Sequence, residues 1–207
     1  MMRKTIFILF GAAIIGGAIL FAAARTAKRE IIPDIMKTLD SNEAQSDRAP
    51  LAPLADPLIV VKKSARKLHL YDGEQLVATY NIGLGFAPVG DKERQGDGKT
   101  PEGEFYIFTK NPQSSYYLSL GVSYPGADDA ERGLREKLIT RSQHDAILRA
   151  NRERKTPPQK TRLGGEIYIH GNGSTRDWTW GCVALDDADM KELFDSVAVG
   201  ARVRIEP

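Results

Sequence analysis

The sequence predicts a mainly β domain with a helical insertion and one helix near its end, preceded by an apolar N-terminal segment. Three observations indicate this class. Short apolar or alternating runs, typical of strands, recur through residues 58–205. The dipeptide Asp72-Gly73 is a strong turn signal between two of these runs. Segments with helical composition or periodicity are confined to residues 127–154 and 186–197.

Length, charge and cysteine count narrow the function classes. The chain has 207 residues, 29 basic and 27 acidic side chains, a net charge of +2 and 42% hydrophobic residues. This balance suits one domain with an appendage and excludes a disordered or collagen-like chain. No basic stripe interleaved with aromatic residues is present, so a nucleic-acid partner is unsupported. The single cysteine cannot form an internal disulfide or a thiolate metal cluster, so it is either inert or reactive.

Residues 1–29 form the expected N-terminal membrane anchor or signal segment. Residues 5–24 are uncharged and would span about 30 Å as a helix, the thickness of a bilayer's hydrocarbon core. Basic residues flank this run on both sides, so they orient it only weakly. A signal peptide cleaved after Ala22–Ala24 is the alternative, but secretory apolar cores usually have only about 7–15 residues. We expect the rest of the chain to be exported, and a cytosolic domain is the less favoured orientation.

Residues 30–57 predict a linker, because four prolines stand among Ser, Asp and Asn residues there. We expect this linker to tether a catalytic domain, residues 58–207, to the membrane.

Strand signals follow one another along the domain. Residues 58–61 are β-branched and apolar, and residues 67–71 alternate toward the Asp72-Gly73 turn, after which residues 76–82 return as a hairpin. The remaining expected strands are residues 104–109, 117–124, 166–170 and 201–205.

The helical signals are fewer. Asp186 or Asp187 can cap a helix that ends near Val197, and Gly200 suits the chain reversal after it. Its apolar stripe consists of Met190, Leu193, Phe194 and Val197. Residues 127–154 are rich in Ala, Glu, Arg and Leu, which indicates one or two surface helices. Their role is left open between a lid over the site and a solvated decoration.

Chemistry-bearing residues gather between His170 and Cys182. A predicted strand ends at His170, and Cys182 follows Gly181 just before the capped helix. A thiol nucleophile needs a nearby base, since the thiolate is the reactive form and imidazole can accept the proton. The backbone N–H groups of Gly181 and Cys182 are expected to form an oxyanion hole. We expect Gly171, Thr179 and Trp180 to contact substrate.

Simpler interpretations of the same residues stay open at this point. A lone cysteine is often a small buried hydrophobe, and a histidine at a strand end is often structural. Trp178 and Trp180 can serve as packing residues or as a substrate wall. Zinc is disfavoured because Cys182 and His170 supply only two ligands.

Two motifs in order resemble the YkuD-type L,D-transpeptidase family. The first is His170-Gly171 followed by Thr179-Trp180-Gly181-Cys182. The second is the loop Asp97-Gly98-Lys99-Thr100-Pro101-Glu102-Gly103. The resemblance covers about residues 58–207 and includes the segment 111–120. It implies a mixed β-sandwich of the L,D-transpeptidase type.

What the resemblance implies for function is acyl transfer in cell-wall organisation, with a bearing on cell shape. Cys182 would attack a peptidoglycan tetrapeptide stem, His170 would move the proton, and D-alanine would leave. The acceptor would be an amine on a second stem or on a wall-linked lipoprotein. No metal or organic cofactor is implied.

One departure from the family pattern keeps a second function open. Many members carry arginine two residues after the cysteine, whereas this chain has Ala184. Neither Arg176 nor Lys99 can be assigned as its replacement. The alternative is a related thiol-dependent carboxypeptidase or amidase that trims stems or releases wall-linked protein. A non-catalytic wall-binding module is the third hypothesis.

Overall fold

The computed structural model describes residues 51–207, which lie within one compact unit, Pro50–Pro207. The expected segment 1–29, and residues 30–50 of the expected linker, lie outside the described residues. Within residues 51–207, no helix is both long enough and apolar enough to cross a bilayer.

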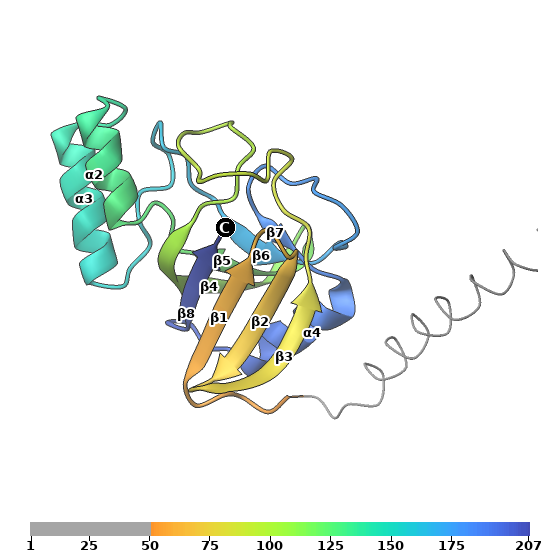
Figure 1. Ribbon diagram of the computed structural model, residues 1–207. Coiled ribbons are helices and arrows are strands. Elements are labelled where there is room, and N and C mark those ends of the chain that lie inside the picture. The colour runs from red at the N-terminus through yellow and green to blue at the C-terminus, as the bar shows by residue number, and fades with distance from the viewer. Residues whose placement is uncertain (1–50) are drawn as a thin grey trace, which may run out of the picture. The chain divides into compact units, whose positions relative to one another are not determined.

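Eight strands form the sheet, in the spatial order β3-β2-β1-β8-β4-β5-β6-β7 (Figure 1). The strands are β1 Pro57–Lys62, β2 Lys67–Asp72, β3 Gln75–Asn81, β4 Gly103–Ser114, β5 Tyr117–Val122, β6 Tyr168–His170, β7 Val183–Ala184 and β8 Arg202–Glu206. Seven of them coincide with the runs expected from the sequence. The two-residue β7 was not expected, because so short a run carries no alternation, and its pairing with β6 defines it.

The expected mainly β fold is confirmed, and the eight strands form one curled sheet whose two halves enclose the main core. The long strand β4 pairs with β8 through residues 103–106 and with β5 through residues 107–114. One strand therefore joins both halves, and the sheet bends at β4. Strand β8 connects β1 to β4 within the sheet, since it lies parallel to β1 and antiparallel to β4.

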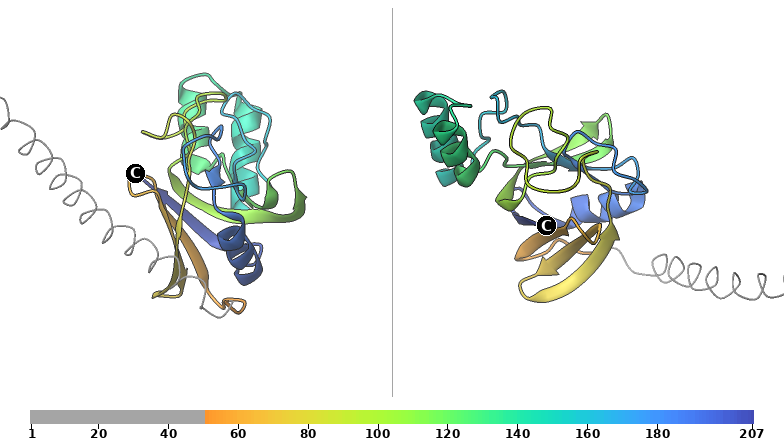
Figure 2. Two further views of the ribbon diagram at one scale, coloured as in Figure 1. Left: turned by 90° about the vertical axis from the view of Figure 1, so that its right-hand side faces the viewer. Right: turned by 45° about the horizontal axis from the view of Figure 1, so that its top comes forward.

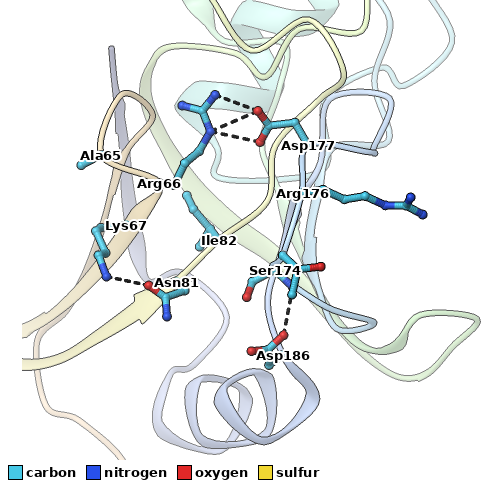
Figure 3. Close-up of a pocket in the computed structure, with 10 residues that line it drawn as sticks. Ala65, Arg66, Lys67, Asn81, Ile82, Ser174, Arg176, Asp177 and Asp186 are labelled. Carbon is cyan, nitrogen blue, oxygen red and sulfur yellow. Dashed lines mark hydrogen bonds and ion pairs between the residues drawn. The ribbon is translucent and has the colours of Figure 1, made fainter. Parts of the chain in front are cut away.

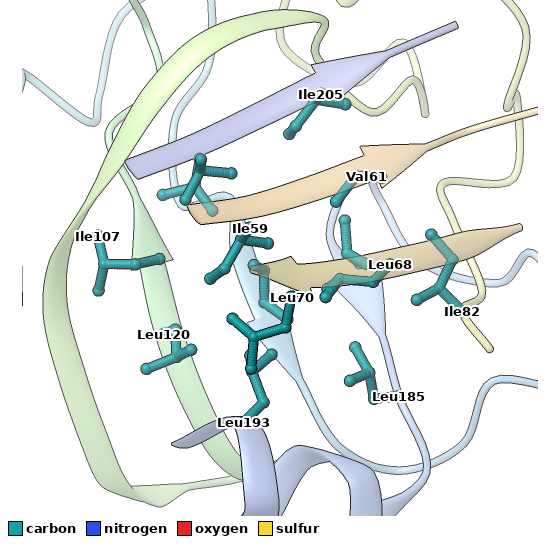
Figure 4. Packing of buried hydrophobic residues seen from close by; sticks show 14 of the residues in the cluster. Ile59, Val61, Leu68, Leu70, Ile82, Ile107, Leu120, Leu185, Leu193 and Ile205 are labelled. Carbon is teal, nitrogen blue, oxygen red and sulfur yellow. The ribbon is translucent and has the colours of Figure 1, made fainter. Parts of the chain in front are cut away.

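The main core lies between the two halves of the sheet and one helix. Alternation along β1 and β2 buries Ile59, Val61, Leu68 and Leu70 completely. Figure 4 shows these side chains facing residues of β4, β5 and the C-terminal part of the chain, with Leu193 entering from the helix. Burial of each such side chain contributes about 1.5–3 kcal/mol, so this core holds the strands around the site.

The three helices of the described part are α2 Ala127–Arg135, α3 Arg141–Arg152 and α4 Asp187–Ser196. The stripe expected on α4 is buried at Met190 and Leu193. The insertion forms two helices that pack against each other at one side of the domain, away from α4 (Figure 2). They carry a small core of their own, made of Ala130, Ile139, Ile147 and Leu163.

The last residues of the expected linker contact the domain. Leu51 and Leu54 pack against the main core, and the Leu54 N–H donates to the Ser196 carbonyl at 2.9 Å. Asp56 forms an ion pair with Arg202 at 2.9 Å. Strand β1 begins at Pro57, so residues 51–57 belong structurally to the domain.

Candidate active site

The Cys182 thiol lies beside the start of β6, just before β7. The Tyr168 N–H donates to Sγ at 3.4 Å, and the thiol donates to the Glu166 carbonyl at 3.6 Å. Strands β6 and β7 are parallel neighbours, with His170 opposite Ala184. Alternation along the chain therefore places His170 and Cys182, which directly precedes β7, on the same side of the sheet. The pairing thus brings together two residues that are twelve positions apart.

The turn that carries Cys182 requires glycine at position 181. Gly181 has φ +124°, and a Cβ there would come within 2.6 Å of the Lys99 carbonyl oxygen. The Thr179 hydroxyl accepts from the Gly181 N–H at 3.1 Å and donates to the Cys182 carbonyl at 2.7 Å. One hydroxyl therefore bonds the backbone on both sides of the peptide link that precedes Cys182.

The loop of residues 97–103 packs against this turn. The Thr100 hydroxyl accepts from the Gly85 N–H at 3.1 Å, and Gly85 packs against the backbone of Gly98 and Gly181. The buried Lys63 ammonium donates to the Thr100 carbonyl at 3.0 Å and to Glu102 at 2.7 Å. The motif loop thus acts as scaffold beneath the nucleophile.

The His170 imidazole is held in one orientation and tautomer. Its Nδ1 lies 2.7 Å from the Gly171 carbonyl oxygen, which can only accept, so Nδ1 carries the proton and Nε2 is left to act as a base. The Tyr116 ring lies 4.7 Å and the Trp178 ring 5.6 Å from the imidazole, centroid to centroid. Burial in this environment lowers the pKa of His170, although the bond to Gly171 opposes the shift. The imidazole is therefore neutral and competent as a base at neutral pH.

The Cys182 thiol is protonated at rest. Burial raises the pKa of Cys182 to about 11, against the opposing effects of the Tyr168 N–H and the Lys92 charge. A neutral thiol and a neutral imidazole that line one cavity are the resting state of a pair that transfers the proton as the nucleophile attacks.

Two cavities adjoin the site, and both are lined by Cys182 and Glu166. The first, of about 380 Å³, lies under the β4–β5 hairpin and includes His170, Tyr116 and Tyr168. The second, also of about 380 Å³, lies on the other side and includes Lys92 and Trp180 among its lining residues. A group bound covalently to Sγ would be accessible from both.

Of the three residues expected to contact substrate, one is exposed at a cavity and two are buried. Trp180 is 70% exposed, packs edge-to-face on Phe86 and lines the second cavity. Thr179 is buried and holds the turn through the hydroxyl contacts described above. Gly171 is also buried; its carbonyl orients His170, and a Cβ there would come within 2.4 Å of Asp187. Thr179 therefore holds the Cys182 turn and Gly171 orients His170, and both are buried.

The two expected oxyanion donors, the N–H groups of Gly181 and Cys182, differ in whether they already have a hydrogen-bond partner. The Gly181 N–H is already bonded to Thr179. The Cys182 N–H has no hydrogen-bond partner within residues 51–207, so it is the donor available to a developing oxyanion.

Position 184 is closely packed and leaves no space for a long side chain. Ala184 is fully buried opposite His170, and its N–H and C=O both bond to Gly83. Lys99 forms an ion pair with Glu93 at 3.2 Å, whereas Arg176 lines a neighbouring cavity of about 450 Å³ with Tyr116 and Trp178.

The loop between His170 and Cys182 is rigidly attached. Asp177 accepts from the Arg66 guanidinium at 2.7–3.1 Å and from the Leu84 N–H at 3.0 Å, as Figure 3 shows for the ion pair. These contacts outweigh burial and lower the pKa of Asp177. The N–H groups of Asn172 and Ser174 are bound by Asp187 and Asp186 at the start of α4.

Sequence reasoning did not identify Tyr116, Tyr168 or Glu166 as part of the site. Tyr116 reaches His170 from the β4–β5 turn, and only the fold brings that turn to the imidazole. Across residues 51–207, no group of three or more His, Cys, Asp or Glu side chains is arranged to hold a metal ion.

Residues 56–205 match the model of the YkuD family, described as the L,D-transpeptidase catalytic domain. The chain belongs to this family, which confirms the resemblance in its two motifs.

The chain spans less than half the length of the relatives described here. The YafK protein of Escherichia coli, named a putative L,D-transpeptidase, is 36% identical over 88 residues, which are 39% of this chain and 35% of that protein. The helical cell shape determining protein Pgp2 of Campylobacter jejuni is 24% identical with a TM-score of 0.50, over 73% of this chain and 47% of Pgp2. The K307A variant of Pgp2 is also 24% identical, with a TM-score of 0.51, and the match covers 75% of this chain and 48% of the variant. These structures show the shared fold.

Proposed function

We propose that the protein is a peptidoglycan L,D-transpeptidase that uses Cys182 as its nucleophile and His170 as its base. The observation that carries the proposal is the arrangement of this pair: they lie on the same side of the sheet and line one cavity, and the bond to Gly171 leaves His170 Nε2 free to accept a proton. Membership of the YkuD family supports acyl transfer as the reaction class.

The first half-reaction forms a thioester. Cys182 Sγ attacks the carbonyl of the amide that joins the third stem residue to D-alanine, and its proton passes to His170 Nε2. The Cys182 N–H stabilises the oxyanion. The C–N bond then breaks, His170 returns the proton to the leaving nitrogen, and D-alanine departs.

The second half-reaction moves the acyl group to an acceptor. An amine attacks the thioester, the C–S bond breaks, and the thiol is regenerated. The two cavities lined by Cys182 support this scheme, because donor and acceptor can approach from different sides. Cross-linking of this kind would influence cell shape, the property for which Pgp2 is named.

Hydrolysis is the second candidate, and the buried Ala184 favours it, since this branch lacks the arginine of many transpeptidases. With water as acceptor, the same thioester would yield a trimmed stem or a released wall-linked protein. We place either activity in the cell envelope outside the cytoplasmic membrane, anchored or released, because of the apolar run at residues 5–24.

The test uses the full-length protein, a disaccharide tetrapeptide and a carbapenem. We expect D-alanine release, new 3–3 cross-links and a single carbapenem adduct on Cys182, detected by intact-mass measurement and peptide mapping. Cys182→Ala should abolish all three while the circular dichroism spectrum stays unchanged. Shortened stems without cross-links would identify a hydrolase. A folded wild-type protein whose Cys182 forms no adduct would refute the nucleophile assignment.

A further inference from the structure

Glu166 has a backbone conformation that is uncommon for its residue type. The sequence places it at the start of a strand, but its φ is +55°, in the left-handed region that non-glycine residues seldom adopt. Its N–H donates to Gln159 Oε1 at 2.6 Å, and its carbonyl accepts from the Cys182 thiol at 3.6 Å. Such conformations persist where surrounding contacts impose them, and they cluster at functional sites.

This conformation places Glu166 beside the nucleophile and in the lining of both cavities. Glu166 and Cys182 are the two residues that both cavity linings share. Glu166 is exposed, so its carboxylate is accessible to a ligand from solvent, in contrast to the buried His170. Burial is the main reason that the pKa of Cys182 is raised, and the negative charge of Glu166 adds to the effect, as expected for a carboxylate close to the sulfur.

The neighbouring cations are already neutralised. The Lys92 ammonium in the second cavity is buried and bonded to Asp97 at 2.7 Å, and Lys99 is paired with Glu93. Within residues 51–207, no cation forms an ion pair with Glu166. The carboxylate therefore leaves a net negative charge at the mouth of the site, which favours a positively charged group.

We propose that Glu166 binds the ammonium group of the acceptor, and so directs the thioester toward an amine instead of water. This inference rests on the proposed function, because it concerns the second half-reaction at Cys182. Its ligand is a primary alkylammonium, whether it comes from a second stem or from a protein lysine.

The chemistry balances with the residues present. The bound R–NH3⁺ transfers one proton to His170 Nε2, and the neutral amine attacks the thioester carbonyl. The new nitrogen–carbon bond forms, the nitrogen loses a second proton to solvent, and the C–S bond breaks. His170 then protonates the Cys182 thiolate, so Glu166 positions the amine and is unchanged at the end.

The test measures how the acyl-enzyme is partitioned. Full-length protein is acylated with the tetrapeptide donor in the presence of Nα-acetyl-lysine amide, whose only charge is its ammonium, and the adduct and the trimmed stem are quantified. For Glu166→Gln we expect the KM for this amine to rise about tenfold, because a charge-assisted hydrogen bond is about twice as strong as a neutral one. D-alanine release is measured in parallel for each protein, so that any change in acylation is separated from a change in how the acyl-enzyme is partitioned.

Two controls separate charge recognition from structural damage. Hydroxylamine is uncharged near neutral pH, so its reaction with the acyl-enzyme should be the same in Glu166→Gln and in the wild type. Glu74→Gln changes an exposed glutamate in the β2–β3 turn and should leave both acceptors unaffected.

Each outcome decides one of the two proposals. Equal partition in Glu166→Gln and wild type would overturn the role of Glu166 while the proposed function stands. Equal losses for lysine amide and hydroxylamine would show a structural role and would also overturn it. An acyl-enzyme that passes only to water in the wild type would refute amine binding. Absence of D-alanine release would refute the proposed function itself.

Discussion

Gly181→Ala is predicted to separate the local cost of the active-site turn from ordinary glycine effects. Gly181 has φ +124°, a conformation that is strained for any residue with a Cβ. The added methyl group would also meet the Lys99 carbonyl oxygen at 2.6 Å and Ile167 Cδ1 at 3.1 Å. Since the nearer contact is to backbone, either the motif loop or the Cys182 turn must move.

The two contributions can be estimated separately. The strained φ costs about 1–3 kcal/mol. Forcing a methyl group into a packed site costs about 1–3 kcal/mol more. Gly200→Ala is the matched control, because Gly200 has φ +93° and open space around the added Cβ. It should show the strain alone, so the difference of about 1–3 kcal/mol between the variants reports the collision. This corresponds to a further fall in Tm of about 2–12 °C.

Thermal unfolding and carbapenem acylation together provide the assay. We expect Gly181→Ala to acylate about 100-fold more slowly than the wild type, since a displacement of about 1 Å at a reacting group has an effect of this size. Gly200→Ala should acylate at the wild-type rate. If Gly181→Ala unfolds at the same temperature as Gly200→Ala and acylates normally, the proposed steric requirement at the turn is wrong.

Two further predictions concern the charged and titrating groups of the domain. Lys63→Met should lower the free energy of unfolding in urea by about 3–5 kcal/mol, because Lys63 is 2% exposed and its removal leaves the partly buried Glu102 carboxylate and the Thr100 carbonyl without its ammonium. Lys62→Met should cost less than about 1 kcal/mol, since its pair with Glu206 is solvent-exposed, and equal losses would contradict this account. Alkylation of folded Cys182 by iodoacetamide should accelerate about tenfold per pH unit between about pH 8 and 10, because its pKa is raised to about 11 and only the thiolate reacts. The urea-unfolded chain should instead approach a plateau above about pH 8.5, and a plateau below about pH 9 in the folded protein would rule out the raised pKa.

Alternation and turn chemistry predicted most of the strands, because each of these signals depends on neighbours in sequence. The β2–β3 hairpin follows from Asp72-Gly73, and Gly73 has the positive φ that its turn requires. The α4 helix follows from its stripe, and Asp186 stands at its N-cap position, although its carboxylate accepts from the Ser174 N–H and makes no capping bond. The insertion of residues 127–154 likewise forms helices, as its composition indicated.

Local sequence patterns did not predict which distant segments pair with each other. Strand β8 lies between β1 and β4, which are far from it in sequence, and this placement joins the two halves into one curled sheet. Strand β7 has two residues and is defined only by its partner β6. Glu166 has the pattern of a strand residue, but its contacts with Gln159 and Cys182 hold it at positive φ.

The sequence by itself determined the family and the candidate nucleophile and base, because a single cysteine after Thr179-Trp180-Gly181 and a preceding His-Gly step are local patterns with few interpretations. Only the tertiary structure decided what surrounds them. It buried Ala184 opposite His170, brought the Tyr116 ring onto the imidazole and opened two cavities at one sulfur. Neighbouring lysines show the reason most simply: Lys62 and Lys63 are chemically identical, yet one is exposed and the other buried, since burial and pairing depend on segments that fold in from elsewhere in the chain.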